Sequence, residues 1–387
     1  MTRKKLLLFF LVLTVGLSVF NYTHKGISSG QVSEKCATKN NDGRPDAKSQ
    51  CWENMINSAL KEEGLDSAFD VLADLYSGEP EFVRDCHSYT HKLGEAAYRK
   101  FVNHEDMVLT AKTSYCGYGF YHGFMEALLF SGGKIEEARR FCAYAGEALA
   151  GQTSDAEGAC YHGIGHGTVD GGDPTAWGNP GKMVEPGLEM CEKVADTETK
   201  KNRCASGVFN SLAIMFSDPK YKLNEPKPYE ICTNQSMPYF KKACYEEMNT
   251  LILRLNDYDV VKASGMVGDI KDSDYAATAM QTLAGYAASF AETKKMDTHD
   301  IVKICHSVRN DLSMPCIIGF GGGLMEFGTP GTEYDRALDL CGSGELNNEE
   351  RKICFGRVLW LASVLYPAEK HIKVCGMVKE EFRSNCP

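Results

Sequence analysis

The sequence has no excess of basic charge, and no segment of it forms a basic stripe. Its 387 residues include 42 lysines and arginines against 52 aspartates and glutamates, which gives a formal net charge of −10 at neutral pH. Proteins that bind nucleic acid through its phosphates need clustered positive charge on one face or along one helix. The composition therefore predicts no nucleic-acid partner.

The sequence also lacks the short motifs of several large enzyme classes. It contains no P-loop, no glycine-rich dinucleotide fingerprint, no Gly-x-Ser-x-Gly, no His-Glu-x-x-His and no haem-attachment Cys-x-x-Cys-His. Cys-x-x-Cys is absent as well, which disfavours a thioredoxin-like redox role. What the chain does contain is an unusual number of cysteines and a cluster of histidines.

Only one stretch is long and apolar, and it lies at the N-terminus. A basic segment, residues 3–5, precedes the uncharged run 6–20, which is short for a spanning helix and typical of a signal peptide. Residues 1–20 are therefore expected to be a signal peptide or an uncleaved signal-anchor, the latter being the only expected contact with a membrane. Residues 21–50 are polar and are expected to form a tether. Both alternatives place the body of the protein outside the cytoplasm, whether secreted, periplasmic or anchored facing outward.

The 16 cysteines indicate disulfides formed in an oxidising compartment. Six of them follow a large apolar residue near the end of an expected helix: Cys142, Cys191, Cys232, Cys305, Cys341 and Cys375. Each is followed a short distance on by a second cysteine, and most of these open another apolar run: Cys160, Cys204, Cys244, Cys316, Cys354 and Cys386. We expect these to form sequential pairs, with Cys36–Cys51 in addition. Cys86 and Cys116 have no such neighbour, and we infer that they pair with each other.

This spacing predicts an all-α fold of helical hairpins, most of them joined internally by a disulfide. Such hairpins are too small to bury their apolar faces alone, so neighbours must stack into an α-solenoid or an α/α-toroid-like array. We expect residues 51–387 to form a single helical-repeat domain. The stapled hairpin is similar to that of Sel1-like repeat proteins. The cysteine spacing and residue pattern of that family are not met, however, and no function is carried over from it.

Five of the 10 histidines fall in three segments between Asp85 and Asp170, each of which begins with a cysteine. Residues four apart on a helix share one face, so each segment would align its nitrogen and oxygen side chains. The candidate metal ligands are these histidines and two of the carboxylates spaced by four: His87, His91, Glu95, His122, His162, His166 and Asp170. The carboxylates are expected either to complete the metal shell or to fix the imidazole tautomers from behind.

A later segment shows that the helical scaffold does not require histidine. Residues 319–326 repeat the pattern of residues 119–126, but Gly322 stands where the earlier segment has His122. At this position histidine occurs only in consecutive early units, which indicates a chemical role rather than packing. The alternative is that histidines at helix starts cap or pack.

Glu126 and Tyr121 are the candidate catalytic residues, the first as a base and the second as a donor to substrate. A glutamate also stands at the matching place of the later segment, so Glu126 could instead hold backbone or orient a ligand. Glycines are dense around His122, His162 and His166. They predict close backbone approach, either of helix to helix or of backbone to ligand.

The expected cofactor is a transition-metal ion, copper, zinc or iron, because imidazole suits these metals. Five histidines with up to three carboxylates exceed one tetrahedral shell, which allows two ions. The pairs His87/His91 and His162/His166 also resemble the ligand pairs of type-3 copper proteins, and the resemblance covers only these pairs.

The expected function is that of an exported metalloenzyme that activates water or oxygen, with a small molecule or a glycan as substrate. Hydrolysis and oxidation both stay open. Three alternatives also stay open. One is metal capture or delivery without turnover. Another is a helical scaffold that binds a protein or a glycan. The third is a toroidal enzyme acting on polysaccharide through histidine and tyrosine without metal.

Overall fold

The computed structural model describes Cys36 and residues 47–105, 107–153, 155–169, 173–223, 227–384 and 386–387. Within these ranges the chain is helical and no strand occurs, which confirms the all-α prediction. The expected signal peptide or anchor at 1–20 lies outside the described residues. So does the expected tether, apart from Cys36 and residues 47–50.

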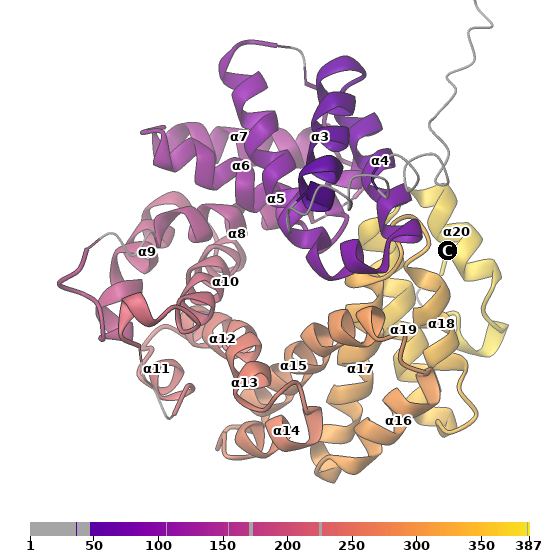
Figure 1. Ribbon diagram of the computed structural model, residues 1–387. Coiled ribbons are helices and arrows are strands. Elements are labelled where there is room, and N and C mark those ends of the chain that lie inside the picture. Colours follow the sequence, from indigo (N-terminus) through magenta and orange to yellow (C-terminus); the bar gives the residue numbers. More distant parts are fainter. Residues whose placement is uncertain are drawn as a thin grey trace, which may run out of the picture.

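The helices follow one another around a ring (Figure 1). A first set packs each helix on the next, in the order α5 (Pro80–Val102), α6 (Gly119–Phe130), α8 (Ala156–Thr168), α10 (Glu198–Met215), α12 (Pro238–Glu247), α15 (Ser273–Thr293), α17 (Asn310–Phe327) and α19 (Asn348–Leu365). A second set packs against the first, namely α7 (Ile135–Ala148), α9 (Pro180–Val194), α11 (Glu230–Thr233), α14 (Val260–Gly268), α16 (Thr298–Ser307), α18 (Tyr334–Gly342) and α20 (Ala368–Gly376).

The remaining helices lie before, between and after these sets: α3 (Ala47–Glu62), α4 (Leu65–Gly78) and α13 (Asn249–Leu255), with the short 3-10 helices η2 (Ala111–Ser114), η3 (Pro219–Tyr221) and η4 (Glu380–Phe382). That the hairpins are copies of one repeating unit stays a prediction. No helix in the described part of the chain is both long enough and apolar enough to span a membrane.

Eight pairs of cysteines lie at disulfide distance, and they are the pairs expected from the spacing. Five pairs join a helix of the second set to the next helix of the first set: Cys142–Cys160, Cys191–Cys204, Cys232–Cys244, Cys305–Cys316 and Cys341–Cys354. The pair Cys375–Cys386 holds the chain end on α20. Closing such short loops stabilises a fold by about 2–4 kcal/mol for each bridge.

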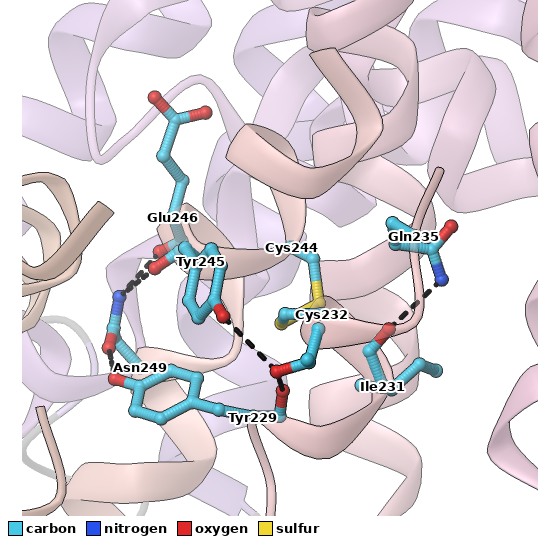
Figure 2. The surroundings of a disulfide bond; sticks show 9 residues. Tyr229, Ile231, Cys232, Gln235, Cys244, Tyr245, Glu246 and Asn249 are labelled. Atoms are coloured by element: carbon cyan, nitrogen blue, oxygen red, sulfur yellow. Dashed lines mark hydrogen bonds between the residues drawn. A yellow bond between two sulfur atoms is a disulfide. The ribbon is translucent and has the colours of Figure 1, made fainter. Parts of the chain in front are cut away.

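Buried polar groups beside one disulfide tie its hairpin to the preceding loop (Figure 2). Near Cys232–Cys244, the Tyr229 hydroxyl donates to the side-chain oxygen of Asn249. The amide of Asn249 donates to the backbone oxygen of Tyr245 at 2.7 Å. Because Asn249 is fully buried, these partners replace the water it loses on folding.

Glycines set the distance between helices of the first set. A Cβ atom at Gly123 of α6 would lie 1.9 Å from the backbone oxygen of His91 in α5. One at Gly207 of α10 would lie 1.9 Å from the backbone oxygen of His162 in α8. At these positions the glycines therefore serve the approach of helix to helix, one of the two alternatives that the sequence left open.

The ring closes where the N-terminal helices meet the end of α17. The Tyr76 hydroxyl of α4 donates to the backbone oxygen of Phe327 at 2.5 Å, across a sequence separation of 251 residues. The ring of Phe327 also lies 2.8 Å from the point that a Cβ of Gly117 would occupy. The end of α17 is thereby placed against the turn that precedes α6.

Candidate metal centre

Three neighbouring helices carry the five histidines of the predicted site. His87 and His91 lie one turn apart on α5, and His162 and His166 lie one turn apart on α8. His122 lies on α6, which packs against both α5 and α8. Because glycines let these helices approach closely, all five imidazoles reach one small volume.

A left-handed turn before α6 fixes the first imidazole. Cys116, Gly117 and Tyr118 have φ angles of 54°, 71° and 59°, and this conformation costs a residue other than glycine on the order of 1 kcal/mol or more. The Cys86–Cys116 disulfide holds the turn, which presents the Cys116 carbonyl oxygen to Nδ1 of His87 at 2.7 Å. A carbonyl only accepts hydrogen bonds, so Nδ1 of His87 carries the proton and Nε2 keeps a free lone pair.

The first histidine trio consists of His87, His91 and His122, whose ligand atoms lie within 4.8 Å of one another. Nε2 of His91 is 3.2 Å from Nε2 of His87 and 3.0 Å from Nδ1 of His122. Nitrogens bound to one metal at about 2.0–2.1 Å lie roughly 3 Å from each other. These two distances therefore match those between ligands of one metal ion, and the trio could hold one.

The second histidine trio consists of His122, His162 and His166, again with ligand atoms within 4.8 Å of one another. Nδ1 of His162 lies 2.6 Å from the hydroxyl of Ser206, which donates its own proton to the backbone oxygen of Arg203 at 2.7 Å. Ser206 must then accept from His162. This leaves Nε2 of His162 unprotonated and free to bind a metal.

His166 supplies the clearest sign of a missing partner. Its Nε2 is buried and has no hydrogen-bond partner, and the residue is only 4% exposed. Its Nδ1 lies 2.9 Å from the Ser211 hydroxyl and 3.6 Å from a carboxylate oxygen of Glu126. An orphaned buried polar atom costs about 1–3 kcal/mol, and a metal ion at Nε2 would satisfy it.

His122 belongs to both trios, and among the described residues no other histidine does. Its ring stacks on the rings of His162 and His166, with centroids 4.8 and 4.3 Å apart. The ring centroids of His91 and His166, one from each trio, are 6.2 Å apart. The five imidazoles therefore form two neighbouring donor groups joined at His122.

Burial keeps the imidazoles of His87, His122, His162 and His166 neutral. It lowers the pKa of His87 to about 3. It also holds the pKa values of His122, His162 and His166 below the ordinary value, and neighbouring histidines add to the effect. Neutral imidazole is the form that binds a metal.

Glu126 lies between the two trios. Its two oxygens face Nδ1 of His91 at 3.7 Å and Nδ1 of His166 at 3.6 Å. Burial by itself raises the pKa of the Glu126 carboxyl, but the facing rings of His166 and His91 outweigh burial and lower the pKa to about 2. The carboxylate of Glu126 therefore stays ionised. It lies at Nδ1 of both His91 and His166, where it can orient the two rings.

Of the other predicted site residues, those in the described part of the chain do not join the two trios. Glu95 belongs to no group of potential metal ligands in the described part of the chain. Tyr121 is completely buried, and its hydroxyl lies 3.0 Å from the Thr113 hydroxyl. Asp170 lies outside the described residues. A third group, His371 with Cys375 and Cys386, contains a disulfide, so its sulfurs are not free for a metal.

Two serines of α10 complete the site and were not predicted. Ser206 and Ser211 contact Nδ1 of His162 and of His166. A signal for Ser206 was present, because it follows Cys204 by the same two positions that separate His162 from Cys160. When Cys204 is aligned with Cys160, Ser206 takes the position of His162.

No protein-family model, curated protein or solved structure matches the chain. The histidine groups could hold a metal ion. The eight disulfides fit an oxidising environment outside the cytoplasm.

Proposed function

We propose that the protein is an exported metalloenzyme that would hold two transition-metal ions, one in each histidine trio, with His122 shared between them as an imidazolate whose ring proton is released to solvent when the second ion binds. The proposal is supported chiefly by ligand nitrogens that lie within 4.8 Å of one another in each trio. It is further supported by partners that engage the opposite ring nitrogen, as Cys116 does for His87 and Ser206 for His162. Such partners fix the tautomer of a metal-binding histidine.

The donor set favours a metal that accepts imidazole alone. Both trios consist of ring nitrogens, which suits copper or zinc better than the iron sites that use two histidines and a carboxylate. A metal pair of this kind activates water or oxygen when bound. We assign Glu126 to the orientation of His91 and His166, and we assign no role to Tyr121, Glu95 or Asp170.

We also propose the wider setting of this activity. The hairpins would be copies of one unit closed into a toroid over residues 51–387, and the segment 1–20 would direct export. The substrate would be a small molecule or a glycan that reaches the trios. Non-catalytic metal capture is the competing function.

Elemental analysis of the full chain, purified without chelators or a histidine tag, tests the metal site. We expect two ions per chain in the wild type, one in His87→Ala and a loss of both in His122→Ala. His299→Ala is the matched control, because that side chain is 43% exposed and pairs with Glu345. Substoichiometric metal that is the same in wild type and His122→Ala would exclude the proposal.

Exogenous ligand binding separates catalysis from capture. We expect azide to change the visible or paramagnetic-resonance spectrum of the copper-loaded protein, because three protein ligands leave a coordination position open. A spectrum that azide leaves unchanged at saturating concentration would indicate closed coordination and would favour metal capture.

A further inference from the structure

A cleft lies at the closure of the ring, where the N-terminal helices meet the later ones. Its volume is about 470 Å³, and small-molecule sites in proteins measure about 300–1,000 Å³. Tyr76 of α4 and Val83 of α5 line it from the N-terminal helices, and Glu292 of α15, Thr298 of α16 and Arg336 of α18 line it from the later helices. A molecule in this cleft would therefore contact both parts of the chain that meet at the closure.

Two carboxylates of the cleft each keep one oxygen unused. The Glu292 side chain is only 7% exposed, and one of its oxygens accepts from Arg336 at 2.5 Å. One oxygen of Asp339 accepts from the Thr298 hydroxyl at 2.8 Å. The second oxygen of each carboxylate has no hydrogen-bond partner in the described part of the chain, so each can accept from a bound molecule.

The cleft also holds a cation without a partner. Lys295 follows the end of α15 and lines the cleft, and its ammonium makes no ion pair or side-chain hydrogen bond within the described ranges. The other cation of the lining, Arg336, is held in place because it donates to Glu292 and to the backbone oxygen of Met296. Lys295 is thus the charged donor that is left for a ligand.

The charges of the lining are mixed. Three carboxylates, Glu292, Asp297 and Asp339, and two cations, Lys295 and Arg336, line the same cleft. A ligand with a single charge would meet like charge there as well as opposite charge. A neutral hydroxyl both donates and accepts, so it can pair with a carboxylate oxygen or with an ammonium without this repulsion.

Apolar side chains complete the lining. Tyr76, Val83 and Met296 contribute them. Small-molecule sites combine apolar surface of this kind with a few polar groups that fix orientation. A sugar ring matches both parts, because its C–H groups can cover apolar surface while its hydroxyls pair with the polar groups.

We propose that this cleft binds a neutral saccharide, whose hydroxyls donate to Glu292 and Asp339 and accept from Lys295, across the closure of the ring. The site is independent of the proposed function, because none of the described residues that line it belongs to a histidine trio. A saccharide bound there contacts both α4 and α18 and so holds the ring closed.

Saturation-transfer NMR on the full chain, followed by titration calorimetry, tests the proposal with defined probes. The saccharides are cellobiose, maltose, lactose and N,N′-diacetylchitobiose, and the charged probes are inorganic phosphate and putrescine. At least one saccharide is expected to bind saturably. The absence of saturable binding by every saccharide would overturn the proposal, and binding of phosphate or putrescine instead would assign the cleft to a charged ligand.

Substitutions in the cleft decide whether the saccharide lies there. Lys295→Met and Asp339→Ala are each expected to weaken its binding at least tenfold, which is the effect of losing one hydrogen bond to a charged group. Lys294→Met is the matched control for the lysine, because Lys294 lies over the ring of Phe290 and does not line the cleft. Asp335→Ala is the control for the aspartate on the same helix, α18. Equal affinity in wild type, Lys295→Met and Asp339→Ala would overturn the proposal.

Amide hydrogen exchange gives a second readout. Exchange in α4 and in α18 is expected to slow when the saccharide is bound, because it contacts both helices. Ser77→Trp places a large side chain in the cleft and is expected to abolish both the binding and the slowing, while exchange without saccharide stays as in the wild type. Exchange in both helices that saturating saccharide leaves unchanged would overturn the placement across the closure.

Discussion

Single hydrogen bonds decide which ring nitrogens of the histidines are free. The hydroxyl of Ser206 is committed to the backbone oxygen of Arg203, so it accepts from His162 and leaves Nε2 of that ring unprotonated. The carbonyl of Cys116 does the same for His87. These partners come from backbone and from small polar side chains rather than from the carboxylates spaced along the sequence.

Ser206→Ala is expected to weaken metal affinity about 10- to 100-fold, because His162 loses the acceptor that fixes its tautomer. Competition with a chromophoric chelator measures the affinity. Ser307→Ala is the control, since that exposed serine donates only to the backbone oxygen of Lys303. Equal affinity in both variants would mean that Ser206 does not position the ring.

Glu247 gives the protein a pH dependence away from the histidines. Its carboxylate accepts from Asn210 at 2.8 Å and from the hydroxyl of Tyr286. Burial raises the pKa of Glu247 from 4.5 to about 7. The folded state therefore holds this proton more tightly than the unfolded state. The resulting stabilisation is complete below pH 4.5 and is lost as the pH rises to about 7.

Glu247→Gln keeps this side chain neutral and is expected to reduce the loss of stability between pH 5 and pH 8. At pH 8 the variant should exceed the wild type by on the order of 2–3 kcal/mol. Urea unfolding at the two pH values measures the difference. Glu189→Gln, at an exposed position, should leave the difference in stability between the two pH values unchanged. A Glu247→Gln variant whose stability varies with pH as the wild type's does would contradict the assignment.

The approach of α5, α6, α8 and α10 is what brings the histidines together. At Gly123 and at Gly207, a backbone oxygen of the neighbouring helix occupies the space that a side chain would need. Histidines on helices spaced by ordinary side chains would not reach the distances of about 3 Å seen in the first trio.

Gly123→Ala is expected to destabilise the protein by about 1–3 kcal/mol or more, because its Cβ would lie 1.9 Å from backbone that cannot move cheaply. Metal content should fall with stability, since α5 and α6 must separate. Gly265→Ala on α14 meets no atom within 4 Å and should stabilise by up to about 1 kcal/mol. Urea unfolding and metal analysis compare the two variants. Equal stability and equal metal content in Gly123→Ala and Gly265→Ala would show that Gly123 does not set the helix spacing.

The disulfide between α5 and the turn before α6 has a separate task from the hairpin staples. It holds Cys116 and Tyr118 in the left-handed conformation that points the Cys116 carbonyl at His87. Replacing Cys86 and Cys116 together by alanine should lower both stability and metal content.

Replacing Cys341 and Cys354 together is the matched control. It removes a staple between α18 and α19 and should cost a similar amount, roughly 2–4 kcal/mol, while metal content stays at the wild-type level. Full metal content after loss of Cys86–Cys116 would show that the turn does not set the site.

Closure of the ring depends on a contact between α4 and the end of α17. Tyr76 binds the backbone of Phe327 across the closure, and Phe327 in turn lies against Gly117 beside His87. The closure thereby places the end of α17 next to the histidine trios.

Tyr76→Phe is expected to cost about 1 kcal/mol by loss of the hydrogen bond. Amide hydrogen exchange should accelerate in α4 and at the end of α17 because the closure opens more often. Tyr98→Phe, which loses a contact with the hydroxyl of Ser131, serves as control. Exchange that is unchanged at both places would show that the closure does not depend on Tyr76.

Much of this protein follows from local patterns in the sequence. Spacings of four residues placed the histidines on common helix faces. The alternation of long and short gaps between cysteines identified all eight pairs, including Cys86–Cys116. The contrast of Gly322 with His122 identified the units that carry the histidine groups. Such features are local because helical pitch and short disulfide loops relate residues that are near in the chain.

Only the tertiary structure decided how the histidines divide. It joined two trios at His122, set Glu126 between His91 and His166, and brought Ser206 behind His162. It also formed the cleft that α4 and α18 line at the closure of the ring. The reason is physical. These arrangements depend on the distances at which helices cross and on the closure of the ring, and both arise from contacts between residues far apart in the chain.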